Sequence, residues 1–202
     1  MGNWYTNICV KGAQQSDVIA ALNELGRRAY VTPDIGGWIV LYDHECDKFD
    51  LDLLESLALT ISSQLACITF ASFNADDDML WLGAYESGKL TTRYSSERRQ
   101  FEDADEFPPI DSVASVLCRI FGKPEKVPLV RRILRRGHGA LGLFSLIFKI
   151  RLAYVVEVLR HGDLAEALGI PSGSVGFGYE YVNRGETPPD MKREALQRTL
   201  NG

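Results

Sequence analysis

Hydrophobic and polar positions in the first half of the chain follow patterns of strands and helices in turn. Residues 4–10 (WYTNICV) alternate with period two, which predicts a strand. Residues 16–25 carry apolar side chains on one helical face, with Ser16 as the expected N-cap and Gly26 as the stop. Two short apolar runs, 29–31 and 38–43, flank a turn that contains proline and glycine, which predicts a hairpin.

A second helix is expected to begin at Asp50 or Asp52, because Asp52 and Glu55 have capping-box spacing. Three further apolar runs separated by short polar turns predict a strand meander that ends near residue 95. The resulting order β-α-β-β-α-β-β-β predicts an α+β fold. It combines an antiparallel sheet and two helices on one face, arranged as a ferredoxin-like start plus an extra hairpin.

The pattern changes after residue 96, so we predict residues 1–96 as an α+β sheet domain. Residues 97–110 are polar, acidic and end in prolines, which is typical of a linker or surface loop. Residues 111–202 are predicted to form a mainly helical unit packed on the sheet domain, with helices from Asp111 and Pro128. Residues 143–159 fit a strand or a buried helix equally well.

Charge is distributed unevenly along the 202 residues. Residues 1–110 hold 8 basic and 18 acidic side chains, residues 111–162 hold 10 and 3, and residues 163–202 hold 4 and 6. An overall charge of −5 disfavours a polyanionic partner. The four scattered cysteines predict reduced core thiols rather than disulfides. No signal-peptide pattern or membrane-spanning run is recognised, so a cytoplasmic protein with no membrane partner is expected.

The arginine cluster RRILRR is the best candidate for contact with an anion or a partner: Arg131, Arg132, Arg135 and Arg136. Two other interpretations compete with it. The cluster is also typical of a solvated helix face, and its charge suits docking onto the acidic N-terminal half. We favour intramolecular docking over contact with nucleic acid.

The segment 163–182 (DLAEALGIPSGSVGFGYEYV) has the spacing of a helix-turn-helix, with Ala165, Gly169 and Val175 at the characteristic positions. Residues 172–182, where the recognition helix would lie, carry no lysine or arginine to contact phosphates. An alternation from Val175 to Tyr181 also allows a strand. We therefore expect a packing unit, and keep nucleic-acid binding as an alternative function.

Catalytic and metal-binding signatures are weak in this sequence. The acidic groups around Asp43 and His44, and the turn Asp76, Asp77 and Asp78, lack metal-ligand spacing. No nucleophile motif accompanies the three histidines. No catalytic residue, cofactor or metal is therefore predicted, and an enzyme with an acidic or histidine-containing site outside known motifs remains a third hypothesis.

Four segments at the two ends of the chain resemble bacterial proteins of unknown function: YTNICVKG, GRRAYV, DDDMLWLGAYESGKL and RHGDLAEALGIPSGSVGFGYEYVNRGETP. The resemblance implies a bacterial cytoplasmic protein and no particular activity or site.

These observations favour a non-catalytic protein-interaction or regulatory module whose partner is another protein. We expect Trp81, Tyr85, the acidic turn 76–78 and the arginine cluster to be exposed for such contacts. The acidic surface suits a basic partner, and the oligomeric state is left open.

Overall fold

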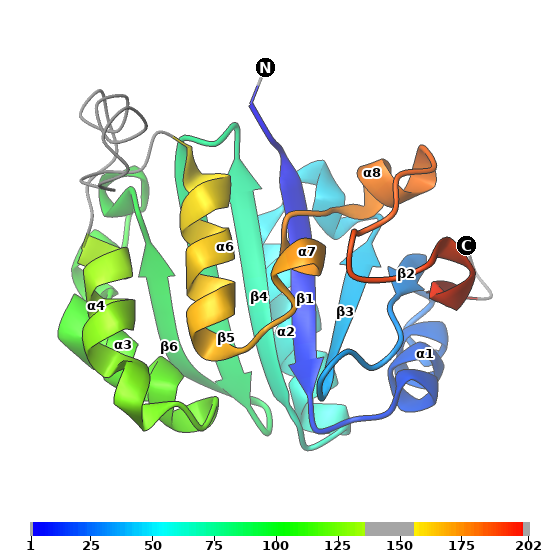
Figure 1. Ribbon diagram of the computed structural model, residues 1–202, viewed down its shortest axis with the longest axis horizontal. Helices are drawn as coiled ribbons and strands as arrows, with labels where there is room; N and C mark the ends of the chain where they lie inside the picture. The colour runs from blue at the N-terminus through cyan, green and yellow to red at the C-terminus, as the bar shows by residue number, and fades with distance from the viewer. Residues whose placement is uncertain (1, 136–155, 200–202) are drawn as a thin grey trace.

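The computed structural model describes residues 2–135 and 156–199 of the chain. It has an α+β fold in which a seven-stranded antiparallel sheet carries helices on both faces (Figure 1). The strand order is β6-β5-β4-β1-β3-β2-β7. The strands are β1 (Tyr5–Lys11), β2 (Ala29–Val31), β3 (Trp38–Asp43), β4 (Ile68–Ala75), β5 (Met79–Glu86), β6 (Lys89–Ser95) and β7 (Gln197–Arg198).

Two helices, α1 (Gln15–Glu24) and α2 (Leu51–Gln64), cover one face of the sheet. Asp50 caps α2, because its side chain accepts a hydrogen bond from the backbone N–H of Leu53. The alternative start at Asp52 is therefore wrong. Ser16 is not the cap of α1 either, since that helix begins one residue earlier, after Gln14.

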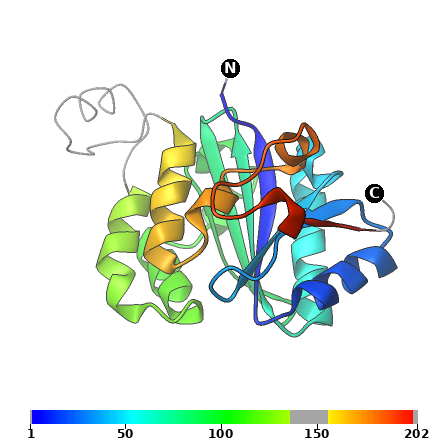
Figure 2. The ribbon, with the colours of Figure 1, turned by 45° about the vertical axis from the view of Figure 1, so that its right-hand side comes forward.

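The opposite face is covered by helices from the second half of the chain (Figure 2). They are α3 (Ile110–Ile120), α4 (Val127–Arg135), α6 (Glu157–Leu168), α7 (Ser172–Val175) and α8 (Tyr179–Asn183). The chain then returns to the sheet, where β7 pairs with β2 at the edge. Residues predicted to form a mainly helical unit thus also supply a strand.

The period-two alternation of the strands divides the core between the two faces. Ile8 and Val10 of β1 point toward α1 and α2, whereas Cys9 between them points toward the later helices. Antiparallel pairing places Ile8 opposite Leu41 of β3 and Ala71 of β4, and these three residues share one face. Both faces of the central strands are therefore buried.

The second half of the chain follows the helical pattern only in part. α3 ends as expected before Gly122, which has a positive φ of 70°. Leu129 of α4 is exposed, because only the stripe formed by Val130, Ile133 and Leu134 faces the core. Most of the ambiguous stretch 143–159 lies outside the described residues.

The structure also bears on two further predictions, for residues 175–181 and 97–110. The alternation from Val175 to Tyr181 does not form a strand, since it spans α7, a bend and the start of α8. Residues 97–110 form two short 3₁₀ turns, and Phe107 near their end packs into the core on the α1–α2 face.

Candidate functional site

The arginines of α4 lie on the face of the sheet opposite α1 and α2. Arg131 and Arg135 both form ion pairs with Asp111 of α3, with N–O distances of 2.7 Å, and Arg132 is exposed. The carboxylate partner of these arginines comes from the neighbouring helix of the same layer, whereas α4 packs on the sheet through the apolar side chains Val130, Ile133 and Leu134. Arg136 lies outside the described residues.

The turn of Asp76, Asp77 and Asp78 joins β4 to β5, and its central residues Asp76 and Asp77 both have positive φ, as in hairpin turns of type I′. The buried Asp77 carboxylate accepts hydrogen bonds from the backbone and side chain of Asn3 and from Asn74. The Asp77 carbonyl accepts from the N–H of Glu157 at the start of α6. Asp77 thus ties the N-terminus, the turn and α6 together.

The aromatic residues expected at the surface are buried. Trp81 and Tyr85 are 1% and 2% exposed, because odd-numbered residues of β5 face α2. Two other aromatic residues are exposed instead, Trp4 at 41% and Phe49 at 39%. No sequence pattern marks these two residues as exposed, since Trp4 belongs to a strand-like alternation and Phe49 stands where a hydrophobic staple precedes a helix cap.

The α1–α2 layer has an acidic outer surface. α2 contains Asp52 and Glu55, is capped by Asp50, and has no lysine or arginine. α1 likewise contains Asp17 and Glu24 and no basic residue, and both of these carboxylates are exposed. Leu59, on the outer side of α2, is 39% exposed. We call the exposed side of α1 and α2 the acidic face.

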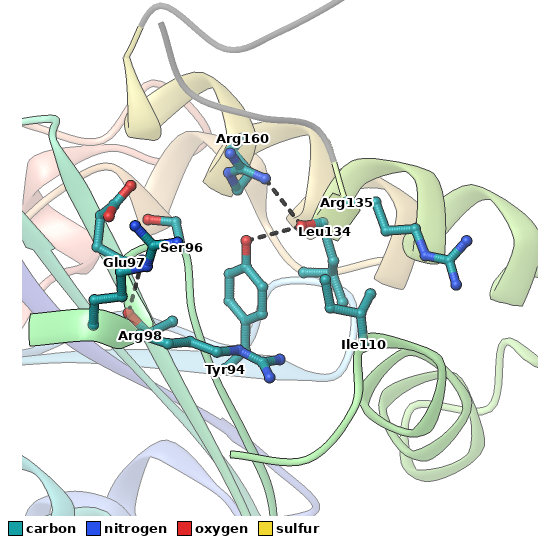
Figure 3. A pocket seen from close by; sticks show the side chains of 10 residues that line it. Tyr94, Ser96, Glu97, Arg98, Ile110, Leu134, Arg135 and Arg160 are labelled. Atoms are coloured by element: carbon teal, nitrogen blue, oxygen red, sulfur yellow. Dashed lines mark hydrogen bonds between the residues drawn. The ribbon is translucent and has the colours of Figure 1, made fainter. Parts of the chain in front are cut away.

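A cavity of about 570 Å³ lies between the end of β6, the start of α3 and the end of α4 (Figure 3). Its lining includes four arginines and one glutamate: Arg98, Arg99, Arg135, Arg160 and Glu97. Figure 3 shows the Tyr94 hydroxyl and the Arg160 guanidinium converging on the Leu134 carbonyl, to which both donate hydrogen bonds.

Three of the arginines in this cavity already hold parts of the fold together. The side chains of Arg160 and Glu157 are 2% and 0% exposed and form a bidentate pair at 2.6 and 3.1 Å. Arg98 donates to the Pro108 carbonyl, and Arg135 pairs with Asp111. The cavity is therefore a basic pocket whose cations join α6 to α4, α4 to α3, and the segment after β6 to the segment before α3.

His161 lies in the middle of α6 and is fully buried against β1 and β4. The Tyr5 hydroxyl lies 2.9 Å from its Nδ1, and the Ser72 hydroxyl lies 3.1 Å from its Nε2. Burial lowers the pKa of His161 to about 3, so the imidazole is neutral at physiological pH. A histidine within hydrogen-bond distance of a serine and a tyrosine hydroxyl also occurs in nucleophilic active sites. Here, however, all three side chains are sealed from solvent, and they join helix to sheet.

The other candidate groups have structural partners as well. Asp43 pairs with Arg27 and accepts from the backbone N–H groups of Glu45 and Cys46. His44 Nδ1 lies 2.6 Å from a Glu45 carboxylate oxygen. Hydrogen bonds from Lys48, which has the larger effect, and from His44 lower the pKa of Glu45 to about 2. Within residues 2–135 and 156–199, no three histidine, cysteine, aspartate or glutamate side chains gather as a metal site.

The four cysteines are buried and unbridged. Burial raises the pKa of all four thiols, to about 11 for Cys67 and Cys118 and higher still for Cys9 and Cys46. Thiols with such pKa values stay protonated at neutral pH and are poor nucleophiles.

The helix-turn-helix spacing corresponds to α6 followed by two very short helices. α7 has four residues and α8 has five. α7 is held against the sheet, where the buried Tyr42 hydroxyl donates to the Ser174 carbonyl and the Asn7 amide donates to the carbonyls of Val175 and Phe177. The segment packs on the sheet and does not present a recognition helix.

Comparisons of the chain with known protein families, with curated proteins and with solved structures find no match. No described helix is both long and apolar enough to span a membrane.

Proposed function

We propose that the protein is a non-catalytic interaction module that binds a basic protein through its acidic face. The observation that carries this proposal is the charge of that face, which contains no lysine or arginine in either helix. Opposite charges steer association and favour one kind of partner over others. Leu59 supplies an exposed apolar side chain on the same face, as interface centres commonly do.

Three further inferences accompany this function. The strand order β4-β1-β3-β2, with α1 and α2 as the connections, supports a ferredoxin-like arrangement of the first six elements. The absence of disulfides among the buried cysteines supports a reducing compartment, which is consistent with a bacterial cytoplasmic protein. The side-chain partners of Asp43, His44 and His161 favour binding over catalysis.

The test reverses charge on the acidic face without disturbing the helices. Glu24 and Gln64 are the last residues of α1 and α2, where a lysine interacts favourably with the helix dipole. The Glu24→Lys/Gln64→Lys variant changes the charge by three units. Glu166→Lys/Ser115→Lys makes the same change at exposed helical positions on the opposite face.

Cross-linking and affinity capture from the source cells, followed by identification of the bound proteins, compare the two variants with wild type. We expect a basic protein that the wild type and the Glu166→Lys/Ser115→Lys control retain, and that the Glu24→Lys/Gln64→Lys variant retains at least tenfold less. Equal retention by both variants, or loss from both, contradicts the proposal.

A further inference from the structure

A second cavity, of about 450 Å³, lies at the end of the sheet where the chain begins. It is separate from the arginine-lined cavity, since the two share no lining residue. Its walls include three aromatic rings, from Trp4 before β1, Phe49 before α2 and Tyr181 in α8. We call it the aromatic pocket; its other lining residues are Gly2, Asp47, Glu180 and Arg184.

The two exposed aromatic side chains of the described chain are both in this pocket. Trp4 and Phe49 are in edge-to-face contact, with ring centroids 4.6 Å apart. Phe49 has a φ of 68°, in the left-handed region that bulky residues rarely adopt. Backbone strain of this kind is concentrated at functional sites. The fold therefore holds the ring of Phe49 at the surface on a strained backbone, beside a second exposed ring.

Carboxylates surround the rings. Asp47 is buried at the pocket wall and accepts hydrogen bonds of 2.9 Å from the backbone N–H groups of Thr6 and Glu180. Gly178 makes room for it, because a Cβ at that position would overlap the Asp47 carboxylate. The Glu180 side chain is exposed. Burial raises the pKa of the Tyr181 hydroxyl, and the carboxylates of Glu186, Asp47 and Asp77 raise it further. The surroundings of the rings are thus electronegative.

Arg184 is the pocket's own cation, and it lies at the C-terminal end of α8. Within the described part of the chain, its guanidinium does not stack on any of the three rings. Among residues 2–135 and 156–199, no lysine or arginine lies over the face of any of the three rings.

We propose that the aromatic pocket binds the guanidinium or ammonium group of an arginine or lysine side chain. Aromatic faces attract cations through their quadrupoles, and nearby carboxylates add charge complementarity. The volume is in the range of pockets that enclose small ligands and is ample for one long side chain. This assignment rests on the proposed function, because the side chain comes from the basic partner protein.

Tryptophan fluorescence tests the pocket without the partner. Trp38 and Trp81 are buried, so a change in emission on adding a ligand reports mainly on Trp4. The probe is N-acetyl-arginine amide, and its matched control is N-acetyl-citrulline amide, which has the same shape and no charge. We expect a saturable change with a dissociation constant in the millimolar range for the arginine probe and at least fivefold weaker binding for citrulline. No saturation, or equal binding of both probes, overturns the proposal.

Three variants and one control, measured by calorimetry with the same probes, show whether the pocket prefers cations. Phe49→Gly removes one ring and also relieves the positive φ, so binding is lost while the folded state persists in a thermal melt. Glu180→Gln weakens arginine binding, whereas the control Glu125→Gln, at an exposed position between α3 and α4 and outside the pocket lining, does not. Arg184→Ala strengthens arginine binding at least twofold. If Arg184→Ala weakens it instead, the pocket is an anion site and the proposal is wrong.

Partner capture separates this inference from the proposed function. If Glu24→Lys/Gln64→Lys loses the basic partner and Phe49→Gly retains it fully, the acidic face stands and the pocket assignment fails. If the arginine probe binds but the wild-type protein retains no basic protein, the pocket stands as a cation site and the proposed function fails.

Discussion

The two faces of the sheet are joined to their helices by different interactions. Between the sheet and α2 the contact is an apolar cluster. It is supplemented by hydrogen bonds at the helix backbone and at the strand ends: Thr69 donates to the Ala58 carbonyl, and Ser62 of α2 donates to the Cys67 carbonyl and accepts from the Gly88 N–H. The opposite face contains an apolar cluster too, but buried polar side chains of the strands also reach the helices. Tyr5 and Ser72 contact His161 of α6, and Asn7 and Tyr42 contact the backbone of α7 and its end.

Chain connectivity accounts for this difference. α1 and α2 each connect strands that follow closely in sequence, so short links restrict where they pack. α6 and α7 follow the last strand of the meander by more than sixty residues. Apolar burial alone is non-directional and allows a helix to slide or turn on the sheet. We infer that the directional hydrogen bonds determine where α6 and α7 lie.

The largest expected effect comes from Arg160, which pairs with Glu157 inside α6 and donates to carbonyls of α4. Arg160→Met removes this buried cation from the Glu157 carboxylate, and it removes the donor to the Ile133 and Leu134 carbonyls. We expect a loss of about 3–5 kcal/mol in the free energy of unfolding, measured by urea denaturation. Arg135→Met is the matched control, because its pair with Asp111 is exposed and should contribute about 0–1 kcal/mol.

If Arg160→Met and Arg135→Met lower the free energy of unfolding equally, the buried directional contacts of α6 contribute no more to stability than an exposed ion pair does. That result would contradict the difference between the two faces.

A somewhat smaller effect should appear in the dependence of stability on pH. His161 has an ordinary pKa of 6.5 when unfolded and about 3 when folded. Between these values the unfolded chain binds more protons, so stability falls as the pH is lowered, by about 1.4 kcal/mol per pH unit from this group. The stability contribution of this group is retained above pH 6.5, and about 3 kcal/mol of it is lost at pH 4.5.

Urea titrations between pH 7 and pH 4.5 measure this slope. His161→Gln keeps a donor and an acceptor in α6 but does not titrate, so its stability should fall less steeply with acid. Parallel curves for the wild type and His161→Gln would show that the buried histidine does not govern acid sensitivity.

The two faces of the sheet also differ in how far the sequence predicts their structure. The α1–α2 face depends on local patterns, so the strands, both helices and the antiparallel sheet were predictable from periodicity. The opposite face depends on pairs distant in sequence, such as Tyr5 with His161 and Asn7 with Val175. No local pattern marks such pairs. The aromatic pocket was missed for the same reason, since Trp4, Phe49 and Tyr181 come together only in the folded chain.

The smallest expected effect isolates one hydrogen bond between the sheet and α7. Tyr42→Phe removes the hydroxyl that donates to the buried Ser174 carbonyl at 3.0 Å, without changing the shape of the ring. That carbonyl still accepts from the Phe177 N–H at 3.3 Å, so the expected loss in the free energy of unfolding is about 1 kcal/mol. Tyr30→Phe is the control, because its hydroxyl makes an exposed contact of 3.4 Å with Asn183.

Amide hydrogen exchange distinguishes a positional role from a general loss of stability. If Tyr42 fixes α7 on the sheet, Tyr42→Phe should accelerate exchange in residues 172–177 more than in α2, which lies on the other face. An equal acceleration in both helices means that the hydroxyl contributes only to global stability. In that case hydrogen bonds do not determine where α7 lies on the sheet, and its position follows from apolar packing alone.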